Sequence, residues 1–463
     1  MPRTVGAPGS LVGTEAALSR TDRTGADGGI SLPWSRTDRP VPRLVVQPLQ
    51  SFLQQETSGA LVLIGAALAA LIWANSSWSA SYHSIWSTHL SIGVGSASVD
   101  LTLREWVTEG LMTLFFFVVG LEIKRELVTG ELRRPREATL PVLAALGGMI
   151  VPALIYVAIV GSDAVDGWGI AMPTDLALAL SVLVLAGRRV PTGLKAVLLA
   201  IAIVDDLGSI VVIAIFYTAH VHWAALGVAA AAIALIALLQ WIDVRATAAY
   251  VVLGIVLWVA LERSGATPTL AGVAVALLVP ATPHHRPKAV SEEAHRIADE
   301  TVDDPNPPDA DAPQWLYLAS LSRAAVSPLA RAERLLHPWT SFVVLPLFAL
   351  ANAGVSLAPP QVWSALGSRI SIGILVARVV GKPVGIWLAS AVAVRTGLAR
   401  LPAGVRMPHV AALGAAAGVP FAVSLFIARL ALPAGLVYDA TVGVLAAAVL
   451  AGIAGSIALR RVT

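Results

Sequence analysis

Two adjacent carboxylates, Asp205 and Asp206, lie in a stretch from Leu194 to Tyr217 that is otherwise nearly free of charge. A helix that rises about 1.5 Å per residue would place both near the middle of a hydrocarbon core about 30 Å thick. Burying one such charge costs at least about 2.5–3.5 kcal/mol, and a neighbouring charge of the same sign adds to this cost. A cation, a proton or a lysine must therefore offset these charges.

A second candidate group follows a proline in the apolar stretch 168–187. Pro173 precedes Thr174 and Asp175, and proline interrupts a helix because it lacks the amide donor and clashes with the preceding turn. The freed carbonyls, the Thr174 hydroxyl and the Asp175 carboxylate would form an oxygen site suited to Na⁺ or Li⁺. The structural alternative is a proline kink in which Thr174 or Asp175 caps the next helix.

A third candidate, Lys382, stands next to Pro383 in the apolar stretch 366–394. Its expected partner is one of the two adjacent aspartates; the other would meet the ion, because neighbouring helical residues point about 100° apart. The alternative is that Lys382 extends to the membrane surface. Arg378 lies one helical turn before Lys382, where like charges repel, and the sequence offers no partner for it.

The elements that must position these residues are membrane spans. The chain has 463 residues, of which 56% are hydrophobic and 13% charged, with a mean hydropathy of +0.76; a soluble protein would carry about 25% charged residues. We expect an all-α polytopic membrane protein with about twelve transmembrane helices. The predicted spans are 59–75, 105–127, 138–161, 168–187, 194–218, 222–241, 247–262, 266–280, 339–357, 366–394, 407–431 and 435–459.

Charge and composition divide the chain further. Lysine and arginine concentrate in the loops after the even-numbered spans, which predicts that both termini are cytoplasmic. We expect a disordered cytoplasmic tail at 1–48, spans 1–8 within 49–280, an acidic, proline-rich cytoplasmic linker at 281–335 that ends in a short amphipathic helix, and spans 9–12 within 336–463. The absence of cysteine excludes disulfides and thiolate metal sites, and the net charge of +3 argues against nucleic-acid binding.

Residues 90–103 alternate between apolar and polar side chains around a Gly-Ser turn. This pattern predicts a small β-hairpin, which lies on the periplasmic face if the termini are cytoplasmic. Such a hairpin could pair edge to edge with a second copy and form a homodimer, or it could be a self-contained loop.

Spans 4 and 11 both contain helix interruptions, at Pro173 and at Gly418–Pro420. Interrupted helices at corresponding positions of two halves indicate the binding site of a secondary transporter. Spans 4 and 11 are the middle members of the triplets 3–5 and 10–12. This arrangement predicts inverted repeats.

Several longer stretches resemble NhaA-type Na⁺/H⁺ antiporters, and the resemblance covers roughly residues 50–280 and 330–460. Those that carry it are Phe-Phe-Val-Val-Gly-Leu-Glu-Ile-Lys-Arg-Glu-Leu at 116–127, Gly-Gly-Met-Ile-Val-Pro-Ala-Leu at 147–154, Thr-Asp at 174–175, Ala-Ile-Val-Asp-Asp-Leu-Gly at 202–208, Leu-His-Pro-Trp at 336–339, Leu-Pro-Leu-Phe-Ala-Leu-Ala-Asn-Ala-Gly-Val at 345–355 and Gly-Lys-Pro at 381–383.

The resemblance implies an electrogenic antiporter of the bacterial inner membrane, without a resident cofactor, that exchanges cytoplasmic Na⁺ or Li⁺ for external protons and regulates intracellular pH and sodium. Na⁺ or Li⁺ and protons would compete for the carboxylates. Asp206 would be the main ion-binding carboxylate and Asp205 the partner of Lys382, with Thr174 and Asp175 at the crossing of the broken helices. The implied metal ligands are Asp206, Asp205 and Thr174, and the residues implied in the pH response are Glu122, Glu126, Glu333 and His337.

The chain departs from the family pattern at three places. Arg334 replaces an expected histidine, Arg378 an expected apolar residue, and 418–423 an expected Gly-Phe-Thr type of segment. Two other classes of function stay open: an intramembrane enzyme that uses paired aspartates, such as Asp175 with Asp206, and a passive cation channel. Proton flux that depends strictly on Na⁺ or Li⁺ would separate an antiporter from both.

Overall fold

The computed structural model describes residues 56–94, 97–187, 191–218, 222–242, 244, 246–283, 285–300 and 312–462. The predicted tail at 1–48 and residues 301–311 of the predicted linker lie outside the described residues. The described part of the chain consists of helices, connecting loops and one two-stranded antiparallel sheet.

Nine helical stretches in the described residues are long and apolar enough to cross a bilayer. They are Thr57–Ala74 in α3 (Glu56–Ala74); Leu103–Val128, made of α5 (Leu103–Glu105), η3 (Trp106–Leu111) and α6 (Met112–Val128); α7 (Pro135–Val160); Gly193–Phe216 in α9 (Thr192–Phe216); α10 (Trp223–Trp241); α11 (Thr247–Ser264); Pro328–Asn352, made of α15 (Pro328–Trp339), η6 (Thr340–Val344) and α16 (Leu345–Asn352); Arg369–Arg395, made of α18 (Arg369–Val376), η7 (Ala377–Gly381) and α19 (Lys382–Arg395); and α22 (Ala434–Val462).

Two further apolar segments are helix pairs with a sharp bend. Helix η5 (Val165–Ala171) and α8 (Leu176–Leu185) meet at 44°, and α20 (Met407–Ala417) and α21 (Ala422–Ala431) meet at 57°. These pairs coincide with predicted spans 4 and 11, so the prediction of two broken helices is confirmed. The described residues thus hold up to eleven spans.

The remaining predicted span, 266–280, contains only the nine-residue helix α12 (Leu270–Leu278). Nine residues extend about 14 Å, which is about half of the hydrocarbon thickness. Val279, which follows the last residue of the helix, has an extended backbone conformation. A residue that precedes a proline favours this conformation, and Val279 precedes Pro280. The twelfth span and the inverted symmetry of the two triplets therefore stay predictions.

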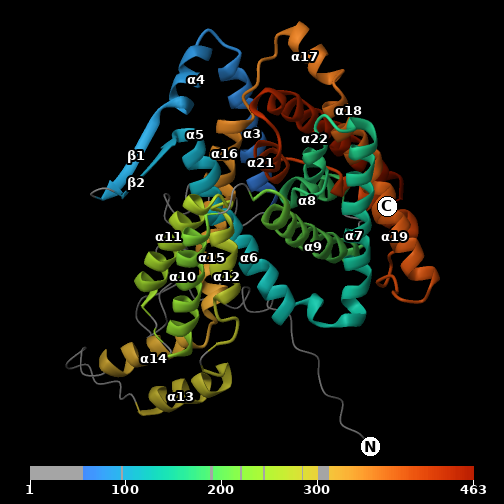
Figure 1. Ribbon diagram of the computed structural model, residues 1–463. Coiled ribbons are helices and arrows are strands. Elements are labelled where there is room, and N and C mark those ends of the chain that lie inside the picture. The colour runs from blue at the N-terminus through green and yellow to red at the C-terminus, as the bar shows by residue number, and fades with distance from the viewer. Residues whose placement is uncertain are drawn as a thin grey trace, which may run out of the picture. The chain divides into compact units, whose positions relative to one another are not determined.

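The predicted β-hairpin is confirmed. Strand β1 (His89–Val94) pairs antiparallel with β2 (Ala97–Thr102), with His89 opposite Thr102 and Ile92 opposite Val99. The hairpin follows the short helix α4 (Ser79–Ser87) and extends away from the helices, at the left of Figure 1.

The predicted linker region contains more helix than the amphipathic segment expected at its end. Helices α13 (Pro287–Glu300) and α14 (Ala312–Ala324) pack against each other, and α15 begins within the same region. Two other short helices connect longer ones: η4 (Glu131–Arg133) precedes α7, and α17 (Pro359–Leu366) precedes α18.

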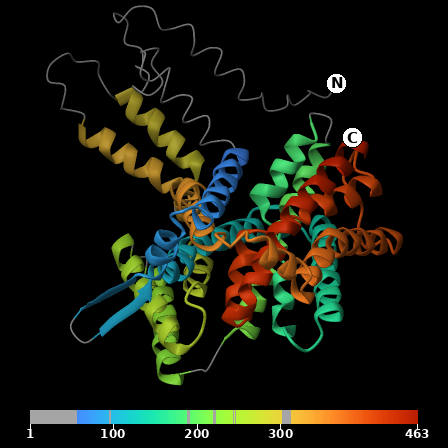
Figure 2. The ribbon, with the colours of Figure 1, turned by 90° about the horizontal axis from the view of Figure 1, so that it is seen from above.

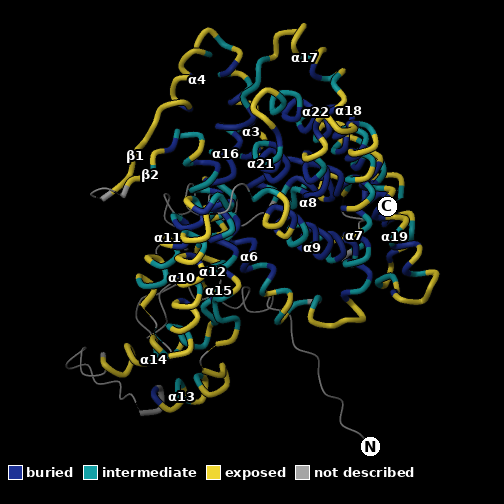
Figure 3. Tube along the Cα trace, viewed as in Figure 1, coloured by how far each residue is buried: buried dark blue, intermediate teal, exposed yellow. Residues whose placement is uncertain are grey.

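The spanning helices form two groups that the views in Figures 1 and 2 separate. In the group that we call the side bundle, α10, α11 and α12 pack together, and α6 packs against α12 and α15. In the group that we call the core bundle, α7 packs against α9, α18 and α19, and α20 packs against α19 and α22. The broken helices lie in the core bundle, where burial is most extensive (Figure 3).

A close contact of two backbones joins α7 to α19. A methyl group added at Gly147 would lie 2.3 Å from the carbonyl oxygen of Gly385, and one added at Gly385 would lie 2.2 Å from that of Gly147. Small residues at such a crossing let membrane helices approach closely. The contact holds the helix that begins with Lys382 against α7, which in turn packs on α9 with its two aspartates.

Candidate functional site

The first helix break, between η5 and α8, contains Pro173, Thr174 and Asp175. Pro173 lies where no helical hydrogen bond is made, so its missing amide donor costs nothing there. Asp175 caps α8, because its Oδ1 accepts a hydrogen bond of 3.1 Å from the backbone N–H of Leu178. The backbone N–H of Ala422, at the start of α21, also interacts with this carboxylate. Asp175 therefore caps its own helix and contacts the second break.

Hydrogen bonds join the second break, Gly418–Phe421, directly to the first. The backbone N–H of Asp175 donates to the carbonyl of Val419 at 3.2 Å. The Thr174 hydroxyl lies 3.0 Å from the carbonyl oxygen of Ala417, which is a second acceptor, beside Asp205 Oδ2, for its single proton. The two breaks thus supply each other's polar groups with partners inside an apolar environment.

The carbonyls that the first break frees have side-chain partners. The carbonyl oxygens of residues 170–172 accept, in chain order, from Ser424 Oγ at 2.9 Å, Arg378 Nη1 at 3.0 Å and Lys382 Nζ at 2.6 Å. We expected such carbonyls to ligate a cation, but in this arrangement these three bind hydroxyl, guanidinium and ammonium groups. Two buried positive charges are thereby anchored at the break.

Asp205 is fully buried and compensated on one oxygen. Its Oδ2 lies 2.6 Å from Lys382 Nζ, whose side chain is also 0% exposed, and it accepts a hydrogen bond of 2.7 Å from the Thr174 hydroxyl. Its Oδ1 is buried and has no hydrogen-bond partner. The structure thus brings together three of the predicted site residues around a single carboxylate.

Asp206 lies in a different environment from its neighbour. It is only partly buried, and within the described residues it makes no hydrogen bond or ion pair. Four charged groups interact electrostatically with the Asp206 carboxylate, and three of them are acidic: Asp205, Glu122, Asp175 and Lys382. Asp206 is therefore the carboxylate of the pair that no positive group of the described residues neutralises by direct contact.

Arg378 completes the set of charged groups in the core bundle. Its side chain is 0% exposed, and its Nε and Nη2 atoms have no hydrogen-bond partner. Nothing in the sequence indicated its contact with the carbonyl of Ala171, 207 residues away. The signal that could have suggested this contact is Pro173, because a broken helix leaves several successive carbonyls that each need a donor.

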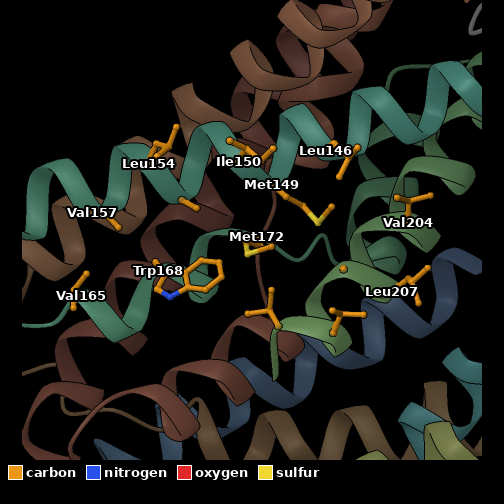
Figure 4. Close-up of a pocket in the computed structure, with 14 residues that line it drawn as sticks. Leu146, Met149, Ile150, Leu154, Val157, Val165, Trp168, Met172, Val204 and Leu207 are labelled. Carbon is orange, nitrogen blue, oxygen red and sulfur yellow. The ribbon is translucent and has the colours of Figure 1, made fainter. Parts of the chain in front are cut away.

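A cavity of about 740 Å³ lies beside these charged groups, between α7, η5 and α9. Figure 4 shows the side chains of Met149, Trp168, Met172 and Leu207 around it. All residues that line it are apolar, so it offers no oxygen ligands to a cation. This hollow is therefore distinct from the carboxylate site.

The residues implied in the pH response lie on two helices that pack together, α6 and α15. Glu122 and Glu126 belong to α6, and Glu333 of α15 forms an ion pair with Arg125 of α6. His337 is exposed at the end of α15. Glu122 links this group to the carboxylate site, because it is one of the charges that act on Asp206.

A sequence model of the family described as Na⁺/H⁺ antiporter 1 matches residues 50–459, which is most of the chain. The chain belongs to the Na⁺/H⁺ antiporter 1 family. Together with its apolar helices, this membership makes the chain a multi-pass membrane protein.

Relatives within the Na⁺/H⁺ antiporter 1 family are similar over nearly their whole length. The Na(+)/H(+) antiporter NhaA 2 of Sorangium cellulosum is 42% identical over 422 residues, 90% of this chain and 89% of the relative. The Na(+)/H(+) antiporter NhaA of Oleidesulfovibrio alaskensis is 42% identical over 91% of this chain and 95% of the relative. The Na(+)/H(+) antiporter NhaA 3 of Frankia alni is 43% identical over 90% of this chain and 89% of the relative. These relatives are named as transporters and not as enzymes.

Proposed function

We propose that this chain is a secondary transporter of the bacterial inner membrane that exchanges cytoplasmic Na⁺ or Li⁺ for external protons and so regulates intracellular pH and sodium. Its membership of the Na⁺/H⁺ antiporter 1 family supports this exchange. The observation that carries the proposal is the contrast between two consecutive carboxylates. Asp205 is bound by Lys382 and Thr174, whereas Asp206 has no partner among the described residues.

Competition for Asp206 explains how the two ions are coupled. An uncompensated carboxylate in the membrane is costly, and either a cation or a proton on Asp206 lowers that cost. Both cannot occupy it at once, so each ion displaces the other. Asp175 and Thr174 lie at the same break, and their oxygens are hard ligands of the kind that Na⁺ and Li⁺ bind.

Electrogenic exchange follows if more than one group takes up a proton in each cycle. Asp206 can bind one proton, and Lys382 can release and regain another, with Asp205 as its partner. One Na⁺ would then be exchanged for more than one H⁺, and net charge would cross the membrane. At acidic pH protons would occupy the site and stop the transport of Na⁺.

Alternating access would be a rigid-body movement of the core bundle against the side bundle. The carboxylates, both breaks and Lys382 belong to the core bundle, whereas the hairpin is connected to α5 and to η3 before α6 of the side bundle. Movement of one bundle as a unit would keep the hydrogen bonds between the breaks and change the side from which Asp206 is reached.

Two further roles belong to the same proposal. Glu122, Glu126, Glu333 and His337 would sense pH, because the ion pair between Arg125 and Glu333 joins α15 to the helix that carries Glu122.

The two-stranded hairpin would join two copies through an outer edge, since each strand is paired on one side only among the described residues. Deleting 89–102 should then convert a dimer into a monomer in detergent.

The decisive experiment is Na⁺-driven proton movement in everted membrane vesicles. We expect Asp206→Asn to abolish it and Asp163→Asn, which removes an exposed carboxylate in the loop after α7, to leave it unchanged. Full exchange by Asp206→Asn would contradict the assignment. Proton flux without Na⁺ or Li⁺ would indicate a channel, and proteolytic activity that depends on Asp175 and Asp206 would indicate an intramembrane enzyme.

A further inference from the structure

We propose that the apolar cavity between α7, η5 and α9 is a groove that binds one acyl chain of a membrane phospholipid, with the headgroup at the end of the groove near Val165. The inference goes beyond the proposed exchange and does not rest on it. It requires only that the chain is a multi-pass membrane protein, so that hydrocarbon surrounds its spanning helices.

The groove opens along one side toward the bilayer. Ile150 and Leu154 of α7 line it and are 54% and 63% exposed, whereas Met149 and Met172 also line it and are each only 5% exposed. The exposed pair forms a rim that continues into the lipid-facing surface of α7, and the buried pair forms the floor. Lipid tails are as apolar as such side chains. An acyl chain can therefore enter from the bilayer without crossing a polar surface.

The length of the groove corresponds to one leaflet of the bilayer. Its lining residues on α7 run from Leu146 to Val157, which is about 16 Å of helix. This is about half of a hydrocarbon core about 30 Å thick, the depth that the acyl chains of one leaflet fill. The volume of about 740 Å³ also falls in the range of about 300–1,000 Å³ that is usual for ligand sites. One extended acyl chain fits both dimensions.

Trp168 supplies a polar group at the end where the headgroup would lie. Its ring lines the groove and packs edge-on against Phe216, with the ring centroids 5.2 Å apart. Among the described residues its indole N–H has no hydrogen-bond partner, and Figure 4 shows the nitrogen on the side of the ring toward Val165. Tryptophan near the end of a span commonly places its ring in hydrocarbon and its N–H among polar groups. A phosphate or ester oxygen of the lipid would accept this hydrogen bond.

The charge at the same end of the groove favours a headgroup that carries an amine. Asp166 directly follows Val165 and is exposed, and its backbone carbonyl accepts a hydrogen bond of 2.6 Å from the Tyr217 hydroxyl. No residue that lines the groove is charged. The Asp166 carboxylate would attract the ammonium of phosphatidylethanolamine and repel the net negative charge of phosphatidylglycerol. We therefore expect phosphatidylethanolamine to bind better than phosphatidylglycerol.

A bound acyl chain would pack against the back of the ion site. Met172 lines the groove with its side chain, while its carbonyl oxygen accepts from Lys382 Nζ at 2.6 Å. Leu207 and Gly208 of α9 also line the groove and follow Asp206 directly. Unfilled space costs the surrounding side chains their dispersion contacts. The lipid would therefore stabilise the packing of η5, which ends at the first break, against α7 and α9.

The first test is the thermal unfolding midpoint of the purified full chain in detergent, measured with and without phosphatidylethanolamine that carries one palmitoyl and one oleoyl chain. We expect this lipid to raise the midpoint of the wild type by several degrees, and phosphatidylglycerol with the same chains to raise it less. Ala153→Phe places a ring in the groove and should remove most of the response to lipid. Ala158→Phe, the same change at an exposed position of α7 outside the groove, is the matched control and should respond like the wild type.

Equal responses of the wild type and Ala153→Phe would overturn the proposal, since the lipid would then act elsewhere on the surface. A larger response to phosphatidylglycerol than to phosphatidylethanolamine would overturn the placement of the headgroup beside Asp166. If Ala153→Phe does not fold, a fluorescence measurement with an unmodified groove decides.

The second test measures contact between the lipid and Trp168 in vesicles that mix phosphatidylglycerol with phosphatidylethanolamine brominated on one acyl chain, because bromine quenches tryptophan fluorescence. The difference between the wild type and Trp168→Phe isolates the Trp168 signal. We expect this signal to be half quenched when the brominated lipid is well below half of the total, as preferential binding requires. Quenching that only follows the brominated fraction, or no quenching, would overturn the proposal. Neither test measures transport, so a failure here can be distinguished from a failure of Asp206→Asn to abolish exchange.

Discussion

Asp205 and Lys382 form an ion pair of 2.6 Å in which neither side chain has any exposed surface. The next residue of the same helix, Asp206, makes no ion pair within the described part of the chain. Consecutive positions on a helix point about 100° apart, which explains how two adjacent carboxylates reach such different surroundings. One carboxylate is paired within the folded structure, and the other has no partner in the part of the chain that the structure describes.

This difference predicts opposite effects on stability for the same substitution. Asp205→Asn removes one member of a buried ion pair and leaves Lys382 charged without a carboxylate, which should cost about 3–5 kcal/mol. Asp206→Asn removes an uncompensated charge and should leave stability unchanged or higher when Na⁺ is scarce. Thermal unfolding in detergent at low Na⁺ measures both.

Added Na⁺ supplies the control for this comparison. A ligand that binds only the folded state raises the unfolding midpoint, because it stabilises that state by RT ln(1 + [L]/Kd). Na⁺ should therefore stabilise the wild type and not Asp206→Asn. A loss of stability by Asp206→Asn as large as that of Asp205→Asn would contradict the division between the two residues.

A second prediction concerns the hydroxyl of Thr174, which donates to the charged Asp205 at 2.7 Å. Thr174→Val keeps the shape of the side chain and removes this donor. Hydrogen bonds to charged groups contribute about 1.5–3 kcal/mol, so the unfolding midpoint should fall by several degrees. Thr174→Ser retains the hydroxyl and should remain close to the wild type; if valine and serine behave alike, the hydrogen bond is not what stabilises the break.

The sequence allowed the breaks and their residues to be located, because proline and charge have strong local effects in a membrane. Pro173 and Pro420 mark both interruptions, and a buried Lys382 required an acidic partner. The choice of Asp205 over Asp206 as that partner could not be made from spacing alone, since it depends on how α9 is rotated against α19.

Long-range contacts could not be predicted from the sequence either, because they also depend on how the helices pack against each other. The carbonyl that binds Arg378 lies 207 residues away, and the π-helical turn η7, which contains Arg378 and ends directly before Lys382, has no sequence marker that we recognised. The apolar run 266–280 predicted a full span, but Pro280 and the extended Val279 end helix α12 after nine residues. Apolar composition predicts burial in the membrane, whereas backbone geometry sets helix length.

A third prediction tests the contact between α7 and α19. Gly147→Ala would place a methyl group 2.3 Å from the Gly385 carbonyl oxygen, so the helices must separate. Such overpacking costs about 1–3 kcal/mol. Gly65→Ala in α3 is the matched control, because a methyl group there meets no atom within 4 Å, and alanine favours a helix over glycine by about 1 kcal/mol. Equal thermal unfolding midpoints of the two variants in detergent would contradict the close contact between α7 and α19.

The last prediction concerns the pH dependence of the hairpin, outside the spans. Ser91 Oγ donates to Asp100 Oδ1 at 2.5 Å, and this hydrogen bond, followed by the charge of His89, lowers the pKa of Asp100 below its usual value. A carboxylate whose pKa is lowered in the folded state stabilises that state above its unfolded pKa, about 3.9, and loses this contribution as pH falls through the folded value.

We therefore expect the Asp100 carboxylate to add no pH dependence to the pairing of β1 with β2 between about pH 5 and about pH 8. Hydrogen exchange of the strand amides, corrected for intrinsic rates, measures this pairing, and protection should decline only in stronger acid. Ser91→Ala removes the hydrogen bond and should move that decline to higher pH. A titration near neutral pH that persists in His89→Gln and disappears in Asp100→Asn would show that the carboxylate has a raised pKa, opposite to the effect of its contact with Ser91.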